Sequence, residues 1–409
     1  MTPDENSLLH LGGTGGRAEY SGDVAKITPI RPRPTVLEFF AGMGLARIGL
    51  ESAGLEVVWA NDYEADKFAL YEGHFGHADG HTFVVGDIAQ VNASDLPQGA
   101  AVAWASSPCT DLSLAGNRLG LSGRESAAFW PWVALLEQMG SESPEVVVLE
   151  NVIGLSTSRK GEDLRTAIRE LNRVGYSIDL LSLDARRFLP QSRPRLFLVG
   201  AKNPPAGDLS GWDFALRPKW THAFYDDASL RMHRAKISTP PPLLESGFGE
   251  LVEDMAADDP RWWNSDKVDE FVRSMSAVQL ERLEGLRSKN SFSFRTAYRR
   301  TREGRPVWEV RADDISGCLR TARGGSSKQA VVRAGLGDLR VRWMTPVEYA
   351  RLMGAGDYNL EGARNSQAQF AFGDAVAVPV VRWLAKEYLV PLLQESSGIN
   401  SSEGLRSVV

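Results

Sequence analysis

The residues with the clearest chemical potential are a cysteine and a glutamate that each follow an apolar run. Cys109 lies in the segment SSPCTDLSLAG, directly after a proline and a strand-like stretch. Glu150 ends the apolar run VVVLE in the next strand-like segment. A thiol and a carboxyl at the ends of two buried strands suit covalent catalysis assisted by a proton donor. A lone Pro-Cys is also typical of a turn beside an inert, buried thiol, so the interpretation depends on the surrounding motifs.

The segments around these two residues predict strands and helices in alternation. Short runs rich in Val, Leu, Ile and Phe predict strands at 36–40, 56–62, 82–88, 100–106, 145–151, 177–183 and 195–201. Helical patterns lie at 45–54, 65–76, 126–140 and 162–175. This alternation predicts an α/β fold with a doubly wound, mostly parallel sheet. Ligands of such sheets bind beyond the carboxyl ends of the strands, where the motifs described here fall.

Changes in composition divide the chain into five parts. Residues 1–33 are predicted to be a disordered leader, and 34–202 the first part of a catalytic, cofactor-binding domain. Residues 203–345 are rich in Pro and Trp and then in basic residues, with one helical pattern near 268–286, and predict a smaller second domain. Thr345 and Pro346 could open a helix, so 346–393 is expected to return to the first domain and its sheet. The Ser- and Gly-rich tail 394–409 is predicted to be disordered.

Bulk composition is that of an ordinary globular protein. Apolar residues make up 43% of the chain and charged residues 24%. No apolar run approaches the roughly 18 residues needed to span a membrane, and the first residues show no secretory pattern. Two cysteines form no disulfide framework and show no zinc-ligand spacing, so we expect no metal. These features favour a cytoplasmic protein.

Charge is distributed unevenly along the chain. The net charge is −6, yet the segment from Arg287 to Arg342 holds fourteen Lys or Arg against five Asp or Glu. Clustered positive charge on an acidic protein is typical of local phosphate binding, because backbone contacts supply most sequence-independent affinity for nucleic acids. A solvated basic face is the alternative explanation.

Three successive strand ends carry groups that suit an adenosine. Gly42 and Gly44 follow the first predicted strand and let the backbone approach a ligand, although the third glycine of a dinucleotide turn is missing. Asp62 ends the second strand and suits two ribose hydroxyls, and Tyr63 could stack on an adenine. Asp87 ends the third strand and could accept from the adenine amino group. This pocket favours S-adenosylmethionine, but taken alone it leaves nicotinamide chemistry open.

The ordered motifs together resemble those of bacterial cytosine-5 DNA methyltransferases over most of residues 35–392. EFFAGMG is similar to the cofactor turn of that family, SSPCTDLSLAG to its catalytic loop, and LENV to its ENV motif. QSRPR at 191–195 matches QxRxR, and GDAV at 373–376 is similar to GN(S/A)V, which the family places beside the first motif. The resemblance implies a class I methyltransferase fold with a smaller, basic target-recognition domain.

The resemblance also assigns roles to individual residues. Cys109 would be the nucleophile, Glu150 the group that binds and protonates the cytosine ring, and Arg195 a holder of the base, with Arg193 in support. The methyl-donor pocket would comprise Phe40, Ala41, Gly42, Met43, Gly44, Asp62, Tyr63, Asp87, Ile88, Pro108, Asp374 and Ala375. Contacts to nucleic acid are expected from Ser113, Arg118, Arg320, Arg323, Gly324, Gly325, Ser326, Ser327, Lys328 and Gln329. Asn151 is expected to orient a loop, and Cys318 to be structural.

Several residues depart from the family pattern. Glu38 replaces the usual Asp and Leu45 the usual second Gly of the pair, and either change could reshape the methionine end of the pocket. Thr110 and Leu112 replace the common Gln and Phe after the cysteine, and Asp374 replaces Asn in the last motif. Neither the nucleophile nor the acid is lost.

The expected activity is transfer of a methyl group from S-adenosylmethionine to carbon 5 of a flipped-out cytosine in double-stranded DNA. The resemblance leaves room for a cognate restriction endonuclease as partner, and the chain is expected to act as a monomer associated with the nucleoid. The alternatives are the same chemistry on tRNA, a methyltransferase-like protein that binds DNA without turnover, and, more remotely, a dehydrogenase. The retained thiol, acid and arginine argue against the non-catalytic alternative.

Overall fold

The structure is a computed structural model that describes residues 32–108, 128–205, 212–320 and 328–396. Cys109 and the segment after it therefore lie outside the described residues, as do nearly all of the predicted leader and tail. The domain limits inferred from composition stay a prediction.

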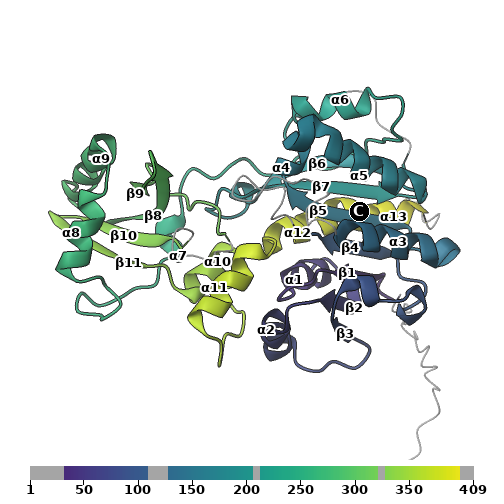
Figure 1. Ribbon diagram of the computed structural model, residues 1–409, viewed down its shortest axis with the longest axis horizontal. Helices are drawn as coiled ribbons and strands as arrows, with labels where there is room; N and C mark the ends of the chain where they lie inside the picture. Colours follow the sequence, from purple (N-terminus) through teal and green to yellow (C-terminus); the bar gives the residue numbers. More distant parts are fainter. Residues whose placement is uncertain (1–31, 109–127, 206–211, 321–327, 397–409) are drawn as a thin grey trace, which may run out of the picture. The chain divides into compact units, whose positions relative to one another are not determined.

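A seven-stranded sheet forms the centre of the chain's first part (Figure 1). Its strand order is β3-β2-β1-β4-β5-β7-β6, and every neighbouring pair is parallel except those made by β7. The strands are β1 (Thr35–Phe39), β2 (Glu56–Asp62), β3 (Thr82–Val85), β4 (Val102–Ser106), β5 (Val146–Val152), β6 (Ser177–Asp184) and β7 (Pro194–Ala201). All seven fall where the apolar runs predicted strands, so the predicted α/β sheet is confirmed.

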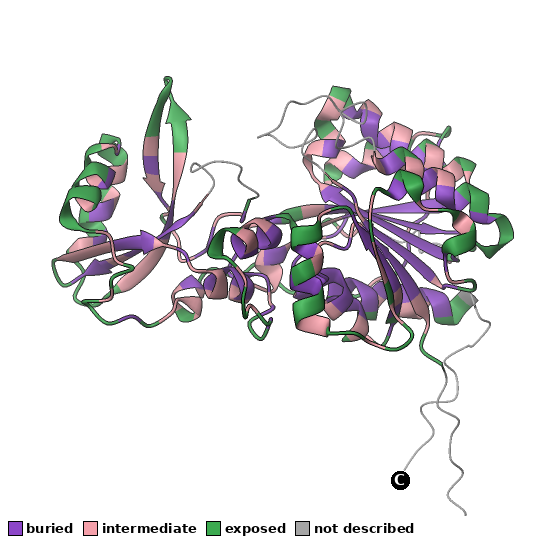
Figure 2. Ribbon diagram, turned by 60° about the horizontal axis from the view of Figure 1, so that its bottom comes forward, coloured by how far each residue is buried: buried purple, intermediate pink, exposed green. Residues whose placement is uncertain are grey.

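Helices cover both faces of this sheet because alternate side chains of each strand are apolar on both sides. Val36 of β1 packs in one cluster with α1 and with α12 (Val378–Leu384), whereas Leu37 packs in a second cluster with α3 and α5. Figure 2 shows the central strands buried between these layers. The helices of this part are α1 (Leu45–Glu51), α2 (Ala65–Phe75), α3 (Phe129–Met139), α4 (Gly154–Thr157), α5 (Glu162–Arg173) and α6 (His222–Tyr225).

A second, antiparallel sheet follows in the chain, with strand order β11-β10-β8-β9. Phe271 and Leu283 pack against Trp308 and Val332 of this sheet. The Trp263 ring contacts the rings of Trp308 and Trp343, which also belong to its strands. Its elements and the short helix before them are α7 (Phe248–Leu251), α8 (Ser265–Arg273), α9 (Ala277–Arg287), β8 (Ser293–Arg302), β9 (Arg305–Val310), β10 (Ala330–Gly335) and β11 (Asp338–Trp343). The smaller second sheet thus lies in the basic part of the chain.

Two expectations for the later part of the chain are refined. The helical pattern at 268–286 belongs to two helices, because extended backbone at Ser276 separates α8 from α9. The end of the chain returns to the first sheet as helices. Val381 of α12 packs so closely on Gly49 of α1 that a Cβ added to Gly49 would lie 2.6 Å from the Val381 Cβ. These helices are α10 (Pro346–Leu352), α11 (Asn365–Asp374), α12 (Val378–Leu384) and α13 (Val390–Ser396).

Within the described ranges, no helix combines the length and apolar character that crossing a bilayer requires.

Thr345 caps α10 as the sequence predicts. Its hydroxyl accepts a hydrogen bond from the backbone N–H of Glu348, and the Glu348 carboxylate accepts one from the backbone N–H of Thr345.

Candidate active site

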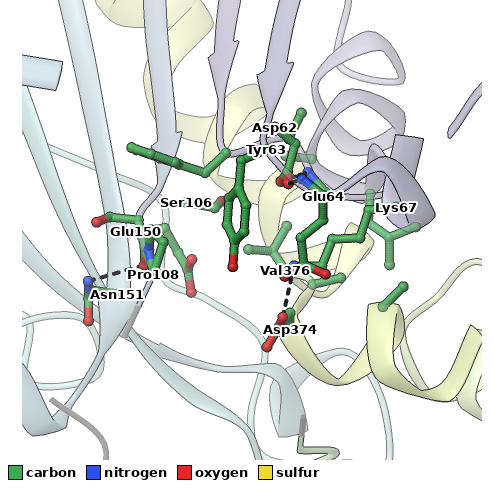
Figure 3. A pocket seen from close by; sticks show the side chains of 18 of the residues that line it. Asp62, Tyr63, Glu64, Lys67, Ser106, Pro108, Glu150, Asn151, Asp374 and Val376 are labelled. Carbon is green, nitrogen blue, oxygen red and sulfur yellow. Dashed lines mark hydrogen bonds and ion pairs between the residues drawn. The ribbon is translucent and has the colours of Figure 1, made fainter. Parts of the chain in front are cut away.

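A cavity of about 360 Å³ opens at the carboxyl ends of β1, β2, β4 and β5 (Figure 3). Its volume is in the range typical of small-molecule sites. Eight of the predicted cofactor residues line it, together with two of the predicted catalytic residues: Phe40, Ala41, Gly42, Asp62, Tyr63, Pro108, Asp374, Ala375, Glu150 and Arg195. The structure therefore gathers motifs that are more than three hundred residues apart in the chain.

The turn after β1 has an unusual backbone. Phe40 and Gly42 have φ of 57° and 58°, in the left-handed region that only glycine adopts freely. The Asp62 carboxylate holds this turn from the side, because it accepts hydrogen bonds from Gly42 N (2.8 Å) and Glu64 N (2.9 Å). Strain at Phe40 is thus located on the wall of the cavity, as is common at ligand sites.

Two residues of the predicted cofactor turn do not line the cavity. The Met43 side chain lies in the hydrophobic core and is 1% exposed. Gly44 has φ of 82°, and a Cβ there would lie 2.5 Å from the Phe75 ring and 2.7 Å from Tyr71. Gly44 therefore allows α2 to pack against the turn, which differs from the contact with a ligand that we expected.

The end of the third strand also lies outside the cavity lining. Asp87 is exposed and accepts from Ala89 N at 2.9 Å, so it caps a short turn. Ile88 is buried in the core with Leu37. A capped turn is the ordinary role of an aspartate after a strand, and a role of Asp87 or Ile88 toward an adenine stays a prediction.

Glu150 lies at the far side of the cavity from Lys67 (Figure 3). It forms an ion pair with Arg195, which also lines the cavity. Arg195 Nε lies 3.1 Å from Glu150 Oε1, and the glutamate side chain is 7% exposed. Burial raises the pKa of Glu150, and the charges of Arg195 and Arg193 together with a hydrogen bond from Ser106 offset only part of that rise. The site therefore favours a carboxyl that holds a proton more tightly than usual.

The carboxyl end of β4 lies directly beside this acid. Ser106 is the register partner of Glu150 between the parallel strands β4 and β5. Asn151 Nδ2 donates to the Ser107 carbonyl at 3.4 Å, which fits its expected role in orienting the loop. Pro108, the last described residue of this segment, lines the cavity, and Cys109 follows it outside the described residues.

Arg193 lies behind the cavity rather than in its wall. Its guanidinium donates to the carbonyls of Leu319 (2.8 Å), Gly373 (2.9 Å) and Ala375 (2.5 Å). It thus joins the QSRPR segment to the last motif and to the junction with the second sheet. These contacts fit the supporting role expected for Arg193, which stays a prediction.

Cys318 is a half-buried thiol beside the two arginines. Arg193 Nη1 lies 3.2 Å from its Sγ. Burial by itself would raise the pKa of Cys318, but the charges of Arg193 and Arg195 lower it below the ordinary thiol value. Gln191 is buried nearby, where its Nε2 donates to Leu352 O and its Oε1 accepts from Leu319 N. The start of the QSRPR segment therefore has a structural function.

Sequence reasoning missed two charged residues of the cavity, Glu64 and Lys67. Both line it, and Lys67 Nζ lies 2.9 Å from Asp374 Oδ2 and 3.4 Å from Glu64 Oε1. The signal was their helical spacing directly after the strand end at Asp62, which puts residues 64 and 67 on one side of α2. Phe370 and Val376, on either side of Asp374, also line the cavity and were not predicted.

The described part of the predicted nucleic-acid segment is small. Arg320 is exposed and Lys328 partly exposed. Gln329 is 3% exposed and donates to the carbonyls of Gly317 and Cys318, so in this structure it offers no surface to a base. The other predicted contacts lie outside the described residues: Ser113, Arg118, Arg323, Gly324, Gly325, Ser326 and Ser327.

Much of the positive charge in the basic segment is paired locally. Examples are Arg302 with Glu309 and Arg333 with Asp338, whereas Arg305 at the tip of the β8–β9 hairpin is exposed.

The described residues contain no group of three or more His, Cys, Asp or Glu arranged to hold a metal ion.

Comparison with known proteins identifies the class. The family of C-5 cytosine-specific DNA methylases matches residues 35–389. The chain is 27% identical over 354 residues to the type II methyltransferase M.NlaX of Neisseria lactamica, covering 86% of this chain and 95% of that protein. It is 26% identical over 374 residues to M1.ScrFI of Lactococcus lactis subsp. cremoris, covering 89% and 81%.

Solved structures show the same fold. Dnmt2 methyltransferase of S. pombe superimposes with a TM-score of 0.56 at 16% identity, covering 90% of this chain and 99% of that one. A putative DNA modification methyltransferase encoded within a prophage of E. coli gives a TM-score of 0.53 at 15% identity, covering 88% and 99%.

The chain belongs to the C-5 cytosine-specific DNA methylase family. The resemblance inferred from its motifs is thereby confirmed. Membership of this methyltransferase family implies use of S-adenosylmethionine.

Proposed function

We propose that this protein transfers a methyl group from S-adenosylmethionine to carbon 5 of cytosine in DNA through a covalent adduct with Cys109. The observation that carries the proposal is the buried Glu150–Arg195 pair on the cavity wall, in register with the strand that leads to Cys109. It supports the proposal because the reaction needs a nucleophile and an acid at neighbouring strand ends.

The cavity fits the methyl donor at several points. Asp62 has a fixed carboxylate on the cavity wall, suited to ribose hydroxyls. Tyr63 lines the cavity and carries an aromatic ring of the kind that stacks on an adenine. When bound, S-adenosylmethionine supplies an electrophilic methyl group on its sulfonium.

The residues of this chain would make the cytosine reactive. The Cys109 thiolate adds to carbon 6, while Glu150 gives a proton or a strong hydrogen bond to N3 and so neutralises the charge pushed into the ring. Carbon 5 would thereby become electron-rich and take the methyl group, with the bond between that methyl and the sulfonium sulfur breaking to release S-adenosylhomocysteine. The original hydrogen of carbon 5 would then leave as a proton to solvent, and the bond between carbon 6 and the Cys109 sulfur would break, which restores the ring and the thiolate and returns the N3 proton to Glu150.

The target base must leave its helix to reach this cavity. A base stacked in a duplex cannot approach a group at a strand end inside a cavity, and flipping costs a few kcal/mol. Phosphate contacts from the basic second sheet would hold the duplex on either side of the target base. No sequence motif identifies the bases that this sheet would read.

Trapping with an oligonucleotide that contains 5-fluorocytosine tests the covalent step. Fluorine cannot leave carbon 5 as a proton would, so the adduct should accumulate and survive denaturing electrophoresis. Cys109→Ser is the matched control and should give no adduct. Absence of an adduct with the unaltered protein and its methyl donor would refute the mechanism.

The position of methylation and the polymer are tested together. Labelled methyl groups should appear as 5-methylcytosine in nucleoside hydrolysates of duplex DNA, and bisulfite sequencing then gives the target site. Label on adenine or on the exocyclic amine of cytosine would contradict the proposal. Preferential labelling of tRNA in competition with duplex DNA would leave the proposed reaction unchanged but would contradict DNA as its substrate.

A further inference from the structure

A cysteine from the later part of the chain lies beside the arginines of the active site. Cys318 belongs to the segment between β9 and β10, and Ser316 of the same segment forms an isolated bridge with Gln191 at the start of QSRPR. The Ser316 carbonyl also accepts from the backbone N–H of Ser192 at 3.0 Å. This pairing brings the Cys318 sulfur to Arg193, which is 125 positions away in the chain.

The Cys318 sulfur accepts hydrogen bonds from two arginines. Arg193 Nη1 donates to it over 3.2 Å, and the Arg195 side chain supplies a second bond. The sulfur also lies 3.3 Å from Leu319 O, to which a thiol can donate, so it remains an acceptor for the arginines with or without its proton. Burial alone would raise the pKa of this thiol, but the charges of Arg193 and Arg195 lower it, and a thiolate is the stronger acceptor.

Arg195 extends this contact to the acid of the cavity. Its Nε lies 3.1 Å from Glu150 Oε1, and the two side chains are 15% and 7% exposed. A guanidinium is planar and carries its five donors in a fixed geometry. An acceptor that holds one part of the group therefore also sets the direction of the rest, and Cys318 and Glu150 bind the same guanidinium.

The sulfur is itself held in place by Arg193. That side chain is 1% exposed, and its guanidinium also donates to the carbonyls of Leu319 and Gly373, at 2.8 Å and 2.9 Å. Gln329 Nε2 fixes the backbone at the same point, because it donates to the Cys318 carbonyl at 3.2 Å. Cys318 is thus a fixed acceptor for Arg195.

We propose that Cys318 is a positioning residue of the methyl transfer, whose sulfur holds the Arg195 guanidinium in place against the Glu150 carboxyl. This inference rests on the proposed function. Cys318 is not among the described residues that line the cavity, so it acts through Arg195 and not by contact with the base or the methyl donor. The sequence predicts only a structural thiol here, whereas these contacts make the cysteine part of the support of the catalytic acid.

The pH dependence of kcat separates this role from a purely structural one. Without the sulfur, Arg195 would be held less firmly and would lower the pKa of Glu150 less, while Arg193 and Ser106 would still act on that acid. We expect Cys318→Ala to reduce kcat about tenfold, the usual effect of losing a hydrogen bond to a charged group. The descending limb should move to higher pH, and KM for S-adenosylmethionine should change less than twofold.

Two further variants and a control complete the test. Cys318→Ser keeps an acceptor, so it should recover most of the lost rate. The double variant Cys318→Ala, Arg195→Met should have the same limb as Arg195→Met alone, because Cys318 acts through Arg195. Ser316→Ala is the matched control, since it removes a buried hydroxyl of the same segment that contacts Gly317 O and Gln329 Oε1, and it should leave the limb unchanged.

Three results would overturn the inference. A limb that stays in place in Cys318→Ala would leave the cysteine with a structural role only. A limb displaced to lower pH would show that the sulfur acts on Glu150 by its own charge, and a further displacement in the double variant would show an effect independent of Arg195. If the unaltered protein does not methylate cytosine, the proposed function fails and the inference with it, and this outcome is distinct because it appears before any substitution.

Discussion

Ser106 and Glu150 are register partners in the parallel strands β4 and β5, and the Ser106 hydroxyl bonds the Glu150 carboxyl. The hydroxyl is itself fixed by Trp104 Nε1, which donates to it at 3.0 Å. Because Cys109 follows Ser106 by three residues, the register brings the segment of the proposed nucleophile to the acid. A shift of β5 by one residue would turn Glu150 to the other face of the sheet.

Replacing Glu150 by Gln should abolish most methyl transfer. Loss of a positioned proton donor typically costs about 10²–10⁴-fold in rate, and we expect kcat to fall in that range while the protein stays folded. Glu145→Gln, at the exposed position just before the same strand, is the control and should keep full activity. Steady-state rates with duplex DNA provide the measurement.

The same acid should shape the pH dependence. In the proposed mechanism methyl transfer needs Glu150 protonated, so kcat should fall as pH rises through its raised pKa. Arg195 opposes that rise in pKa, so in Arg195→Met the descending limb should lie at higher pH, although the overall rate is lower. A limb displaced to lower pH in this variant would contradict the assignment.

Glu38 should make stability depend on pH. Burial raises its pKa to about 8, despite the opposing charge and backbone amide of Arg47. A folded-state pKa above that of the unfolded chain means that the folded protein binds more protons, so the free energy of unfolding should decrease between about pH 4.5 and pH 8.

Urea denaturation at a series of pH values measures this dependence, and Glu38→Gln should flatten it. Glu56→Gln removes an exposed carboxylate from the neighbouring strand and controls for the loss of one charge. If Glu38→Gln leaves the slope unchanged, ionisation of Glu38 is not its cause.

Gly44→Ala should destabilise the protein by more than backbone strain alone. A Cβ at this position meets the rings of Phe75 and Tyr71, and its φ of 82° is already unfavourable for alanine. Gly80→Ala is a matched control, because φ is 84° there and nothing lies within 4 Å of the added atom. We expect about 1 kcal/mol for the control and about 1–3 kcal/mol more for Gly44→Ala. Equal losses in chemical denaturation would show that the rings can move aside.

Arg342→Met should be strongly destabilising. Arg342 and Glu348 form a bidentate pair, with Arg342 Nη1 2.8 Å from Glu348 Oε2, and their side chains are 0% and 1% exposed. Removal of one partner leaves a buried charge and typically costs about 3–5 kcal/mol. The double variant Arg342→Met, Glu348→Met should lose less than the sum of the two single losses in a double-mutant cycle. Additive losses would show that the two charges do not stabilise one another.

The sequence alone predicted the strands of the first sheet and the family of this protein. Runs such as VVVLE and AAVAWAS are apolar on both faces, so they identify buried parallel strands without knowledge of their neighbours. The motifs around Cys109, Glu150 and Arg195 stand in the family's order and identified the family. The proposed methyl transfer needs each of these residue types at a strand end or in a loop.

Only the tertiary structure decided which residues share the cavity. Lys67 and Asp374 are 307 positions apart, and their contact depends on how α11 packs against α2. Gly44, Asp87 and Gln329 match motifs or compositions that suit ligands, yet packing gives them a helix contact, a capped turn and a buried junction. Local sequence sets propensity and polarity, whereas the direction of a side chain depends on long-range packing, which a linear pattern does not contain.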